Sequence, residues 1–260
     1  MVAVKCETDF VANGADFIAM VQQILDAAVA AKAQSLDEVK ALKIGDQDAA
    51  SMVTQRSGIT GEKMEIDGYN FIEGENVEVY DHMNKHTLAT MVQLNQNNAE
   101  AGHKVAMQVA AMKPVALNEE SVSQATKDEE LKVAIEKTKE EQIARQVNVA
   151  LKKAGINPAH VDSEDHIESN TKKGWLTEEQ AAQAREIIKT EGEKAAANLK
   201  EQMIQNIAKG RMAKFFKENC LVDQEFQFAD GDKISVKDWL KAQDKDLAIV
   251  DYKRFTLVAD

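Results

Sequence analysis

The sequence has few of the residues that build disulfide-rich, loop-rich or membrane-spanning proteins. Its 260 residues include two cysteines, two prolines and 12 glycines, and aromatic residues make up 5%. Cys6 and Cys220 form no CxxC pair, so neither a disulfide framework nor a zinc site is predicted. No window reaches the roughly 18 apolar residues of a membrane span, and the first residues show no signal-peptide pattern. We therefore expect a helix-rich, cytoplasmic protein with no membrane as partner.

Basic residues are also fewer than acidic ones. The chain has 32 Lys and Arg against 44 Asp and Glu, which gives a net charge of −12. Such a surface repels phosphate backbones unless a local basic patch exists, and the sequence shows none. The lysines are instead interspersed with glutamates along helical stretches, as on a solvated face. Direct binding of nucleic acid is therefore not expected.

The first 114 residues show patterns of both strands and helices. A strand is predicted at 1–6 and a polar loop at 7–14, followed by a helix at 16–32 and glycine-punctuated loop at 58–74. The stripe that marks the helix at 16–32 consists of Phe17, Met20, Val21, Ile24, Leu25 and Ala28. The remaining predicted elements are helices at 35–43, 49–55 and 99–112 and strands at 76–80 and 87–94.

The composition changes between residues 115 and 209, where Glu, Lys, Gln and Ala dominate. Apolar residues at helical spacing occur on both sides of a break at 155–158, and Thr177 and Gln180 form a capping box. Two long helices and an antiparallel hairpin are predicted, with a further helical turn in the connection at 155–176. Helices at 211–220 and 236–242 and strands within 247–257 complete the chain.

The same order of elements occurs twice, at 2–31 and at 88–112: a strand, a polar loop and a helix with an apolar stripe. Each copy is followed later in the chain by a further strand, at 76–80 for the first and near 252–258 for the second. We predict an α+β fold of two related α/β subdomains, with a projecting antiparallel helical hairpin (coiled coil) inserted in the second. The predicted boundaries are 1–79 for the N-terminal core subdomain, 80–114 and 212–260 for the C-terminal core subdomain, and 115–211 for the insertion.

The stretch from Cys6 to Ala12 is the most informative about function, because Phe10 stands beside Asp9 in a segment between a strand and a helix. Loop aromatics usually pack into their own core, and then Asp9 would cap a turn. Alternatively, Phe10 is an exposed anchor that enters a pocket of a partner, since aromatic residues are favoured binding hot spots. The residues alone leave both interpretations open.

A resemblance to a known family bears on this choice. The chain resembles bacterial elongation factor Ts, in its core and coiled-coil regions and without the N-terminal helical domain with which that family normally begins. The matching stretches follow the family's order: Cys6–Ala12, Gly74–Val77, Tyr80–His82, Lys104–Ala111 with Lys113–Pro114, Gly210–Met212 with Lys214–Phe216, Leu221 and Gln224, and Arg254–Phe255.

The resemblance implies a guanine-nucleotide exchange factor for elongation factor Tu, which it would bind in GDP-bound and nucleotide-free forms. Thr8, Asp9, Phe10 and Val11 would displace the magnesium of the partner and so promote GDP release during translation elongation. Gly74 and His82 would be further partner contacts. The implied protein is not an enzyme and has no catalytic residues, no cofactor and no metal of its own.

The sequence also departs from the family pattern. Met83–Lys85 stands in place of a glycine-rich loop, Glu225 replaces a proline, and the helical insertion is longer than usual. His82 and His86 lie four residues apart, a metal-ligand spacing on a helix, but the segment has the pattern of a strand or loop and lacks a third ligand. The alternative function is a structural or assembly protein that acts through the hairpin, which would also be the contact in a homodimer.

Overall fold

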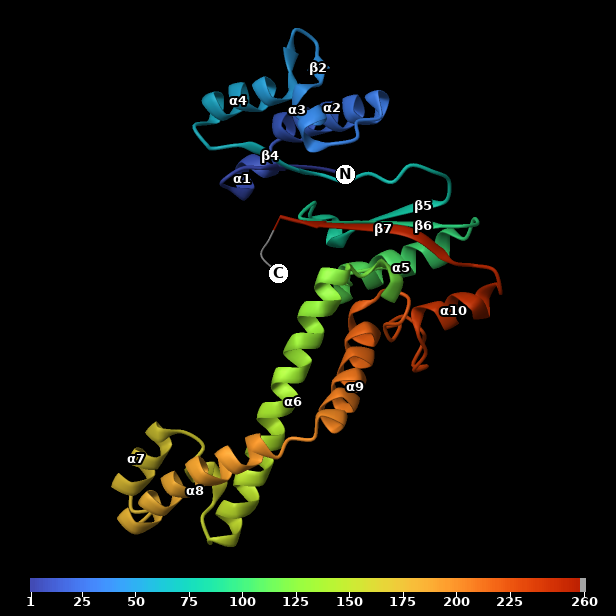
Figure 1. Cartoon of the computed structure of the whole chain (residues 1–260). Coiled ribbons are helices and arrows are strands. Elements are labelled where there is room, and N and C mark those ends of the chain that lie inside the picture. Colours follow the sequence, from blue (N-terminus) through green and yellow to red (C-terminus); the bar gives the residue numbers. More distant parts are fainter. Residues whose placement is uncertain (258–260) are drawn as a thin grey trace. The chain divides into compact units, whose positions relative to one another are not determined.

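The computed structural model describes residues 1–257 and combines helices with small antiparallel sheets, which confirms the α+β class. The chain divides into two compact units, one of residues 1–119 with 218 onward and one of residues 120–217 (Figure 1). Within residues 1–257, none of the helices is both long and apolar enough to cross a membrane.

The first unit contains the described strands together with several helices. In chain order its elements are β1 (Val2–Lys5), α1 (Asp9–Ala12), α2 (Ala15–Ala31), α3 (Leu36–Ala41), β2 (Lys43–Ile44), β3 (Gln47–Asp48), α4 (Ala49–Thr60), β4 (Glu65–Tyr69), β5 (Val77–Asp81), a turn at His82–Asn84, β6 (Leu88–Leu94), α5 (Ala99–Met112), α10 (Val236–Gln243) and β7 (Ile249–Thr256).

The N-terminal part of this unit packs helices against a two-stranded sheet. Strands β1 and β4 are antiparallel, and β2 and β3 form a separate small hairpin. Four residues of the predicted stripe of α2 are buried in a cluster with Val4, Val39, Val53 and Ile66, namely Phe17, Met20, Ile24 and Ala28. Val21 packs against this cluster while partly exposed, and Leu25 is only half-buried. Because these residues recur at helical spacing, burying one face of α2 accounts for its position on the sheet.

Strand β4 corrects the sequence prediction, which assigned residues 58–74 to a loop. Gly68 is the reason this strand was missed, because a glycine weakens a strand pattern. In the fold, Gly68 pairs with Ala3, and both are buried. A Cβ atom at Gly68 would lie 2.0 Å from Cε2 of Phe255, so only glycine lets the Phe255 ring of β7 approach β4.

The second part of the unit is a three-stranded antiparallel sheet in the order β5-β6-β7, on which α5 packs. Its core includes Val92, Val105, Leu221 and Leu240. Strand β5 spans the boundary that was predicted between residues 79 and 80. The predicted repeat assigned the strand at 76–80 to the first subdomain, but this strand belongs to the β5-β6-β7 sheet, and β1 pairs with β4 instead. The relation between the two subdomains stays a prediction.

The second unit is helical throughout its regular elements. They are α6 (Gln124–Lys153), a 3₁₀ turn (Pro158–His160), α7 (Glu164–Lys172), α8 (Glu178–Ala197) and α9 (Glu201–Asn219), the last of which continues into the first unit. The capping box of Thr177 and Gln180 is present at the start of α8, and α7 supplies the helical turn expected in the connection.

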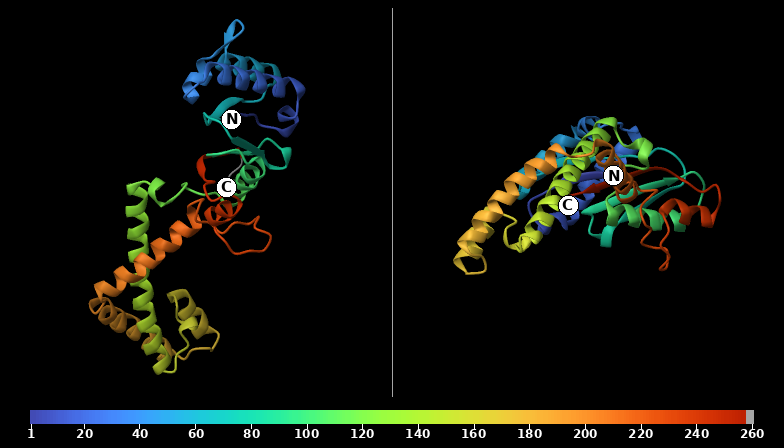
Figure 2. Two further views of the ribbon diagram at one scale, coloured as in Figure 1. Left: turned by 90° about the vertical axis from the view of Figure 1, so that its right-hand side faces the viewer. Right: turned by 60° about the horizontal axis from the view of Figure 1, so that its bottom comes forward.

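Within this unit α8 packs along α6, and α7 packs against α8. The C-terminal end of α6 shares a buried cluster with α7 and α8 that includes Leu151, Ile167 and Ala184, and Figure 2 shows α7 beside this end of α6. Contacts between α6 and α9 join Lys127 to Phe216 and Glu141 to Arg211. Residue numbers rise along α6 as they fall along α9, so these two helices are antiparallel. The predicted projection of the insertion stays a prediction.

The second arm of the hairpin is not the single long helix that its spacing predicted. It is interrupted between Ala197 and Glu201, and Figure 1 shows α8 and α9 as separate helices. The side-chain amide of Asn198 donates to the carbonyl oxygen of Lys194 at 2.8 Å. Asparagine competes for backbone groups in this way, which favours a helix end even without proline or glycine.

Candidate functional site

The segment from Thr8 to Val11 contains a short helix rather than the loop that the sequence predicted. Helix α1 spans Asp9–Ala12, and the Thr8 hydroxyl accepts a hydrogen bond from the Val11 amide at its N-terminus, at 3.3 Å. Asn13 closes the other end, where its side-chain amide donates to the carbonyl oxygen of Asp9 at 2.7 Å. Both ends of this single turn are therefore fixed by side chains.

Phe10 lies on the outer side of this turn, and its side chain is 87% exposed. Val11, the next residue, is half-buried and packs against the core that surrounds α2. Successive helical residues point in different directions, so a turn that directs Val11 inwards directs Phe10 outwards. The exposed position of Phe10 matches the prediction of an exposed anchor, whereas Val11 also has a packing role within its own fold.

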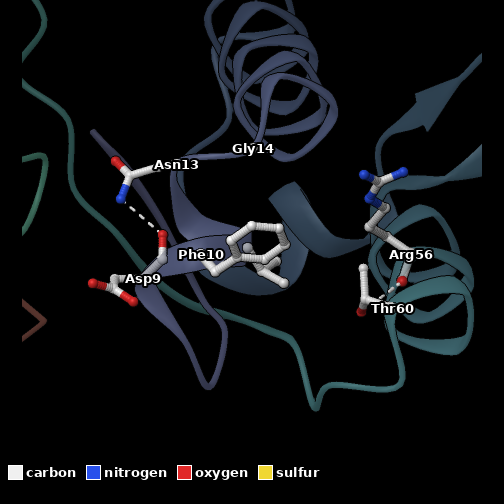
Figure 3. Close-up of a pocket in the computed structure, with 7 residues that line it drawn as sticks. Asp9, Phe10, Asn13, Gly14, Arg56 and Thr60 are labelled. Carbon is white, nitrogen blue, oxygen red and sulfur yellow. Dashed lines mark hydrogen bonds between the residues drawn. The ribbon is translucent and has the colours of Figure 1, made fainter.

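An open hollow of about 550 Å³ separates α1 from the C-terminal half of α4 (Figure 3). Asp9, Phe10, Val11, Asn13, Gly14, Arg56 and Thr60 line it. In Figure 3 the Phe10 ring faces the space towards Arg56 and Thr60, and the carboxylate of Asp9 points away from that space. The hollow thus has an aromatic wall on one side and a polar wall on the other.

Arg56 contributes the positive charge of the hollow. Its guanidinium donates to the carboxylate of Asp16 at 2.9 Å, and this ion pair joins α4 to α2. The Nε atom of Arg56 is buried without a hydrogen-bond partner. A guanidinium has five donor hydrogens, so Arg56 retains donors beyond those used by Asp16.

Gly74 and His82, the further predicted contacts, are outside this hollow and lie at opposite ends of β5. Gly74 is exposed and has a φ of +150°, and a Cβ atom there would lie 2.0 Å from Nε2 of Gln93. That amide donates to the carbonyl oxygen of Glu75 at 3.2 Å. The Gln93 amide is the end of a flexible side chain and could shift, so it is the φ of +150° that favours glycine at position 74, independently of any partner.

His82 is exposed, and its Nδ1 lies 3.0 Å from the hydroxyl of Tyr80. The turn that follows holds Met83, Asn84 and His86 in the left-handed region, with φ of 57°, 52° and 55°. A glycine-rich loop would adopt these angles without strain, and asparagine tolerates them, whereas a residue such as Met83 costs about 1–2 kcal/mol. The backbone of this turn is therefore left-handed at Met83 and Asn84 although neither residue is a glycine.

His82 and His86 are each engaged within this turn rather than with each other. The imidazole of His86 pairs with the carboxylate of Asp81, which also accepts from the His86 amide at 3.0 Å. In the described part of the chain, residues 1–257, no three His, Cys, Asp or Glu side chains are grouped so as to hold a metal ion.

Sequence reasoning missed Glu62, which contacts the predicted site, as well as Asn13, Arg56 and Thr60 around it. The carboxylate of Glu62 lies at the base of α1 and accepts hydrogen bonds from the backbone of Glu7 and Thr8. The neighbouring Cys6 thiol donates to the carbonyl oxygen of Thr8 at 3.3 Å, and its pKa is raised, mainly by burial and then by the charge of Glu62. No local pattern predicts a contact across 54 residues of chain.

Comparison with known sequences gives the family. The model of the family described as "Elongation factor TS" matches residues 7–149 and 133–259. The chain belongs to the elongation factor Ts family. A relative from Bacteroides fragilis named "Elongation factor Ts" is 56% identical over 261 residues, which cover 100% of this chain and 78% of the relative.

Two further elongation factor Ts relatives show the range of similarity. The protein of Phocaeicola vulgatus is 55% identical over 260 residues, covering 100% of this chain and 78% of the relative. That of Porphyromonas gingivalis is 32% identical over 262 residues, covering 100% of this chain and 74% of the relative. Membership of the elongation factor Ts family confirms the predicted resemblance and places the chain among the factors of translation elongation.

Proposed function

We propose that the chain is a guanine-nucleotide exchange factor for elongation factor Tu and that α1 is the element that releases GDP. The observation that carries this proposal is the exposure of Phe10 on a turn whose two ends are fixed. A large aromatic side chain that is 87% exposed leaves most of its apolar surface available to a partner. Family membership supplies the partner.

In the proposed mechanism Phe10 enters the GTPase domain of elongation factor Tu, and Asp9 holds α1 against that surface. Insertion of Thr8 to Val11 would displace the magnesium ion of the partner. That cation offsets the negative charge of the nucleotide phosphates, so its loss would weaken the binding of GDP. Gly74 and His82, at the two ends of β5, would contribute contacts outside the hollow.

Exchange follows from linkage rather than from chemistry. The factor binds nucleotide-free elongation factor Tu more tightly than the GDP-bound form. Binding of the factor therefore lowers the affinity of elongation factor Tu for GDP, and returning nucleotide lowers its affinity for the factor by the same ratio. A coupling of about 4 kcal/mol changes each affinity roughly a thousandfold. No bond is made or broken in this cycle, so it needs no general acid, general base or cofactor.

The direct test measures release of labelled GDP from elongation factor Tu after mixing with this chain and excess unlabelled nucleotide. We expect the release rate to rise with the concentration of the chain and to saturate. An unchanged release rate, with the chain shown by circular dichroism to be folded, would refute the proposal.

A structural role of the helical unit is the second candidate. The cluster that includes Leu151, Ile167 and Ala184 gives residues 120–217 a core of their own, and Trp175 near the same end of the unit is 62% exposed. Such a unit could join copies of the chain into a homodimer or bind another assembly. Analytical ultracentrifugation of the chain with and without residues 120–217 tests this candidate.

A further inference from the structure

Helix α1 cannot be stable through its own backbone hydrogen bonds. It has four residues, Asp9–Ala12, and the first turn of a helix fixes several dihedral angles for each hydrogen bond that it gains. The turn therefore depends on contacts with the rest of the fold. Val11 provides the apolar contact, and at the N-terminal side Glu62 makes three polar contacts and the Cys6 thiol one, to the carbonyl oxygen of Thr8.

Three hydrogen bonds join Glu62 to the segment before α1. Its Oε2 accepts from the amide nitrogen of Glu7 at 3.2 Å and from that of Thr8 at 3.1 Å. Its Oε1 accepts from the Thr8 hydroxyl at 2.5 Å. The carboxylate thus binds both backbone donors at the point where the chain leaves β1 and turns into α1.

The bond to the Thr8 hydroxyl also determines how Thr8 caps the helix. A hydroxyl has one hydrogen to donate and two lone pairs with which to accept. When its hydrogen is directed to Glu62, the lone pairs remain available for the Val11 amide at 3.3 Å. Glu62 therefore selects the hydroxyl orientation in which Thr8 caps α1.

Glu62 is itself held in place by α4. It follows Gly61, which ends α4 with a φ of +76°, and its carbonyl oxygen accepts from the Ser57 hydroxyl at 2.5 Å. Hydrogen bonds therefore run without a gap from Ser57 through Glu62 and Thr8 to α1, which places Phe10 relative to α4.

We propose that Glu62 is a positioning residue for nucleotide exchange, which holds α1 in the orientation that presents Phe10 to elongation factor Tu. This inference rests on the proposed exchange function. It assigns Glu62 no contact with the partner or with the nucleotide. Its effect is on the population of molecules whose α1 is ready to bind, since apparent affinity falls in proportion to that fraction.

The test uses Glu62→Ala, Glu62→Gln and the control Glu65→Ala in the full chain. Glu65 is an exposed acid three residues later, 3.7 Å from Lys63, and its removal changes the net charge equally. Glutamine keeps an oxygen that can accept from both backbone amides but replaces the second acceptor by a donor, so the hydroxyl of Thr8 loses its acceptor.

Two measurements are made on each variant, together with thermal melting. The first is the second-order rate constant for stimulated GDP release, which we expect to fall about tenfold in Glu62→Ala, about threefold in Glu62→Gln and less than about twofold in Glu65→Ala. The second is hydrogen exchange at the amides of residues 11–13, which we expect to be about tenfold faster in Glu62→Ala at an unchanged melting temperature.

The outcomes separate the two proposals. Normal GDP release and normal amide protection in Glu62→Ala would overturn the role of Glu62 and leave the exchange function intact. Equal loss of release in Glu65→Ala would also overturn it, because charge alone would then explain the effect. If the unmodified chain fails to release GDP, the exchange function fails, and amide protection at residues 11–13 still decides whether Glu62 orders α1.

Discussion

Replacement of Phe10 by alanine should separate binding to a partner from stability of the fold. Only about an eighth of the Phe10 side chain is covered in the chain itself. Full burial of a phenylalanine contributes about 1.5–3 kcal/mol, so the covered part contributes about 0.3 kcal/mol. We therefore expect Phe10→Ala to melt within about 1–2 °C of the unmodified chain.

The effect on exchange should be much larger. Aromatic hot spots contribute about 2–4 kcal/mol to binding, so the rate constant for stimulated GDP release should fall between about 30-fold and 1,000-fold at limiting concentration. Phe17→Ala is the matched control, because Phe17 is the same residue type on the next helix and is only 6% exposed. It should lose about 3–5 kcal/mol of stability.

The control makes the result decisive. At a temperature where both variants remain folded, Phe17→Ala should release GDP at nearly the normal rate and Phe10→Ala should not. A melting temperature of Phe10→Ala as low as that of Phe17→Ala would show that Phe10 packs in its own core. Normal release by Phe10→Ala would show that the anchor is dispensable and that other contacts, such as those of His82, release the nucleotide.

Three further predictions concern the fold. Gly68→Ala should destabilise the chain by about 1–3 kcal/mol in chemical denaturation, because the new Cβ would meet the ring of Phe255, and Phe255→Leu should restore part of the loss. Burial raises the pKa of Tyr252 to about 12 from an ordinary 10, so the neutral phenol stabilises the fold below pH 10 and this contribution disappears as pH rises through 12. Allowing for solvent screening, we expect a loss of about 1–2 kcal/mol between pH 9 and 12 that is absent in Tyr252→Phe. Replacing residues 120–217 by a short glycine-serine linker should leave a cooperative melting transition. The β-bridge between Ala116 and Cys220 and the backbone hydrogen bonds beside it already join the segments on either side. A broad, non-cooperative transition would contradict this expectation.

Particular residues show which elements the sequence could predict and which depend on the fold. Helix α2 and the capping box of α8 follow from local spacing, and both are present as predicted. Strand β4 was missed because a glycine at position 68 locally suits a turn. The reason for a glycine within the strand is the Phe255 ring packed against it, and Phe255 is distant in sequence. The break after α8 depends on Asn198, which the sequence pattern did not distinguish from the polar residues around it.

The candidate site divides in a similar way. The chemistry of Thr8 to Val11 was recognisable from a resemblance, but the residues alone did not decide whether Phe10 is buried. Its exposure accompanies the packing of the half-buried Val11 against the core, on a different face of the same turn, which is a property of the fold. Glu62 could not be predicted at all, since its contacts with Thr8 arise only when α4 and β1 are brought together.

The order of α1 affects how a partner would be bound. Fixing the backbone of one residue costs about 1–2 kcal/mol, so a disordered segment of four residues would add several kcal/mol to the cost of association. In this chain Thr8, Asn13 and Glu62 fix the turn during folding, before any partner arrives. A turn that served only the stability of the fold would gain more by burying Phe10 than by exposing it. Ordered backbone together with an unburied aromatic side chain is the combination that association with a partner requires, because the folded chain has already met the entropic cost and the apolar surface is still available.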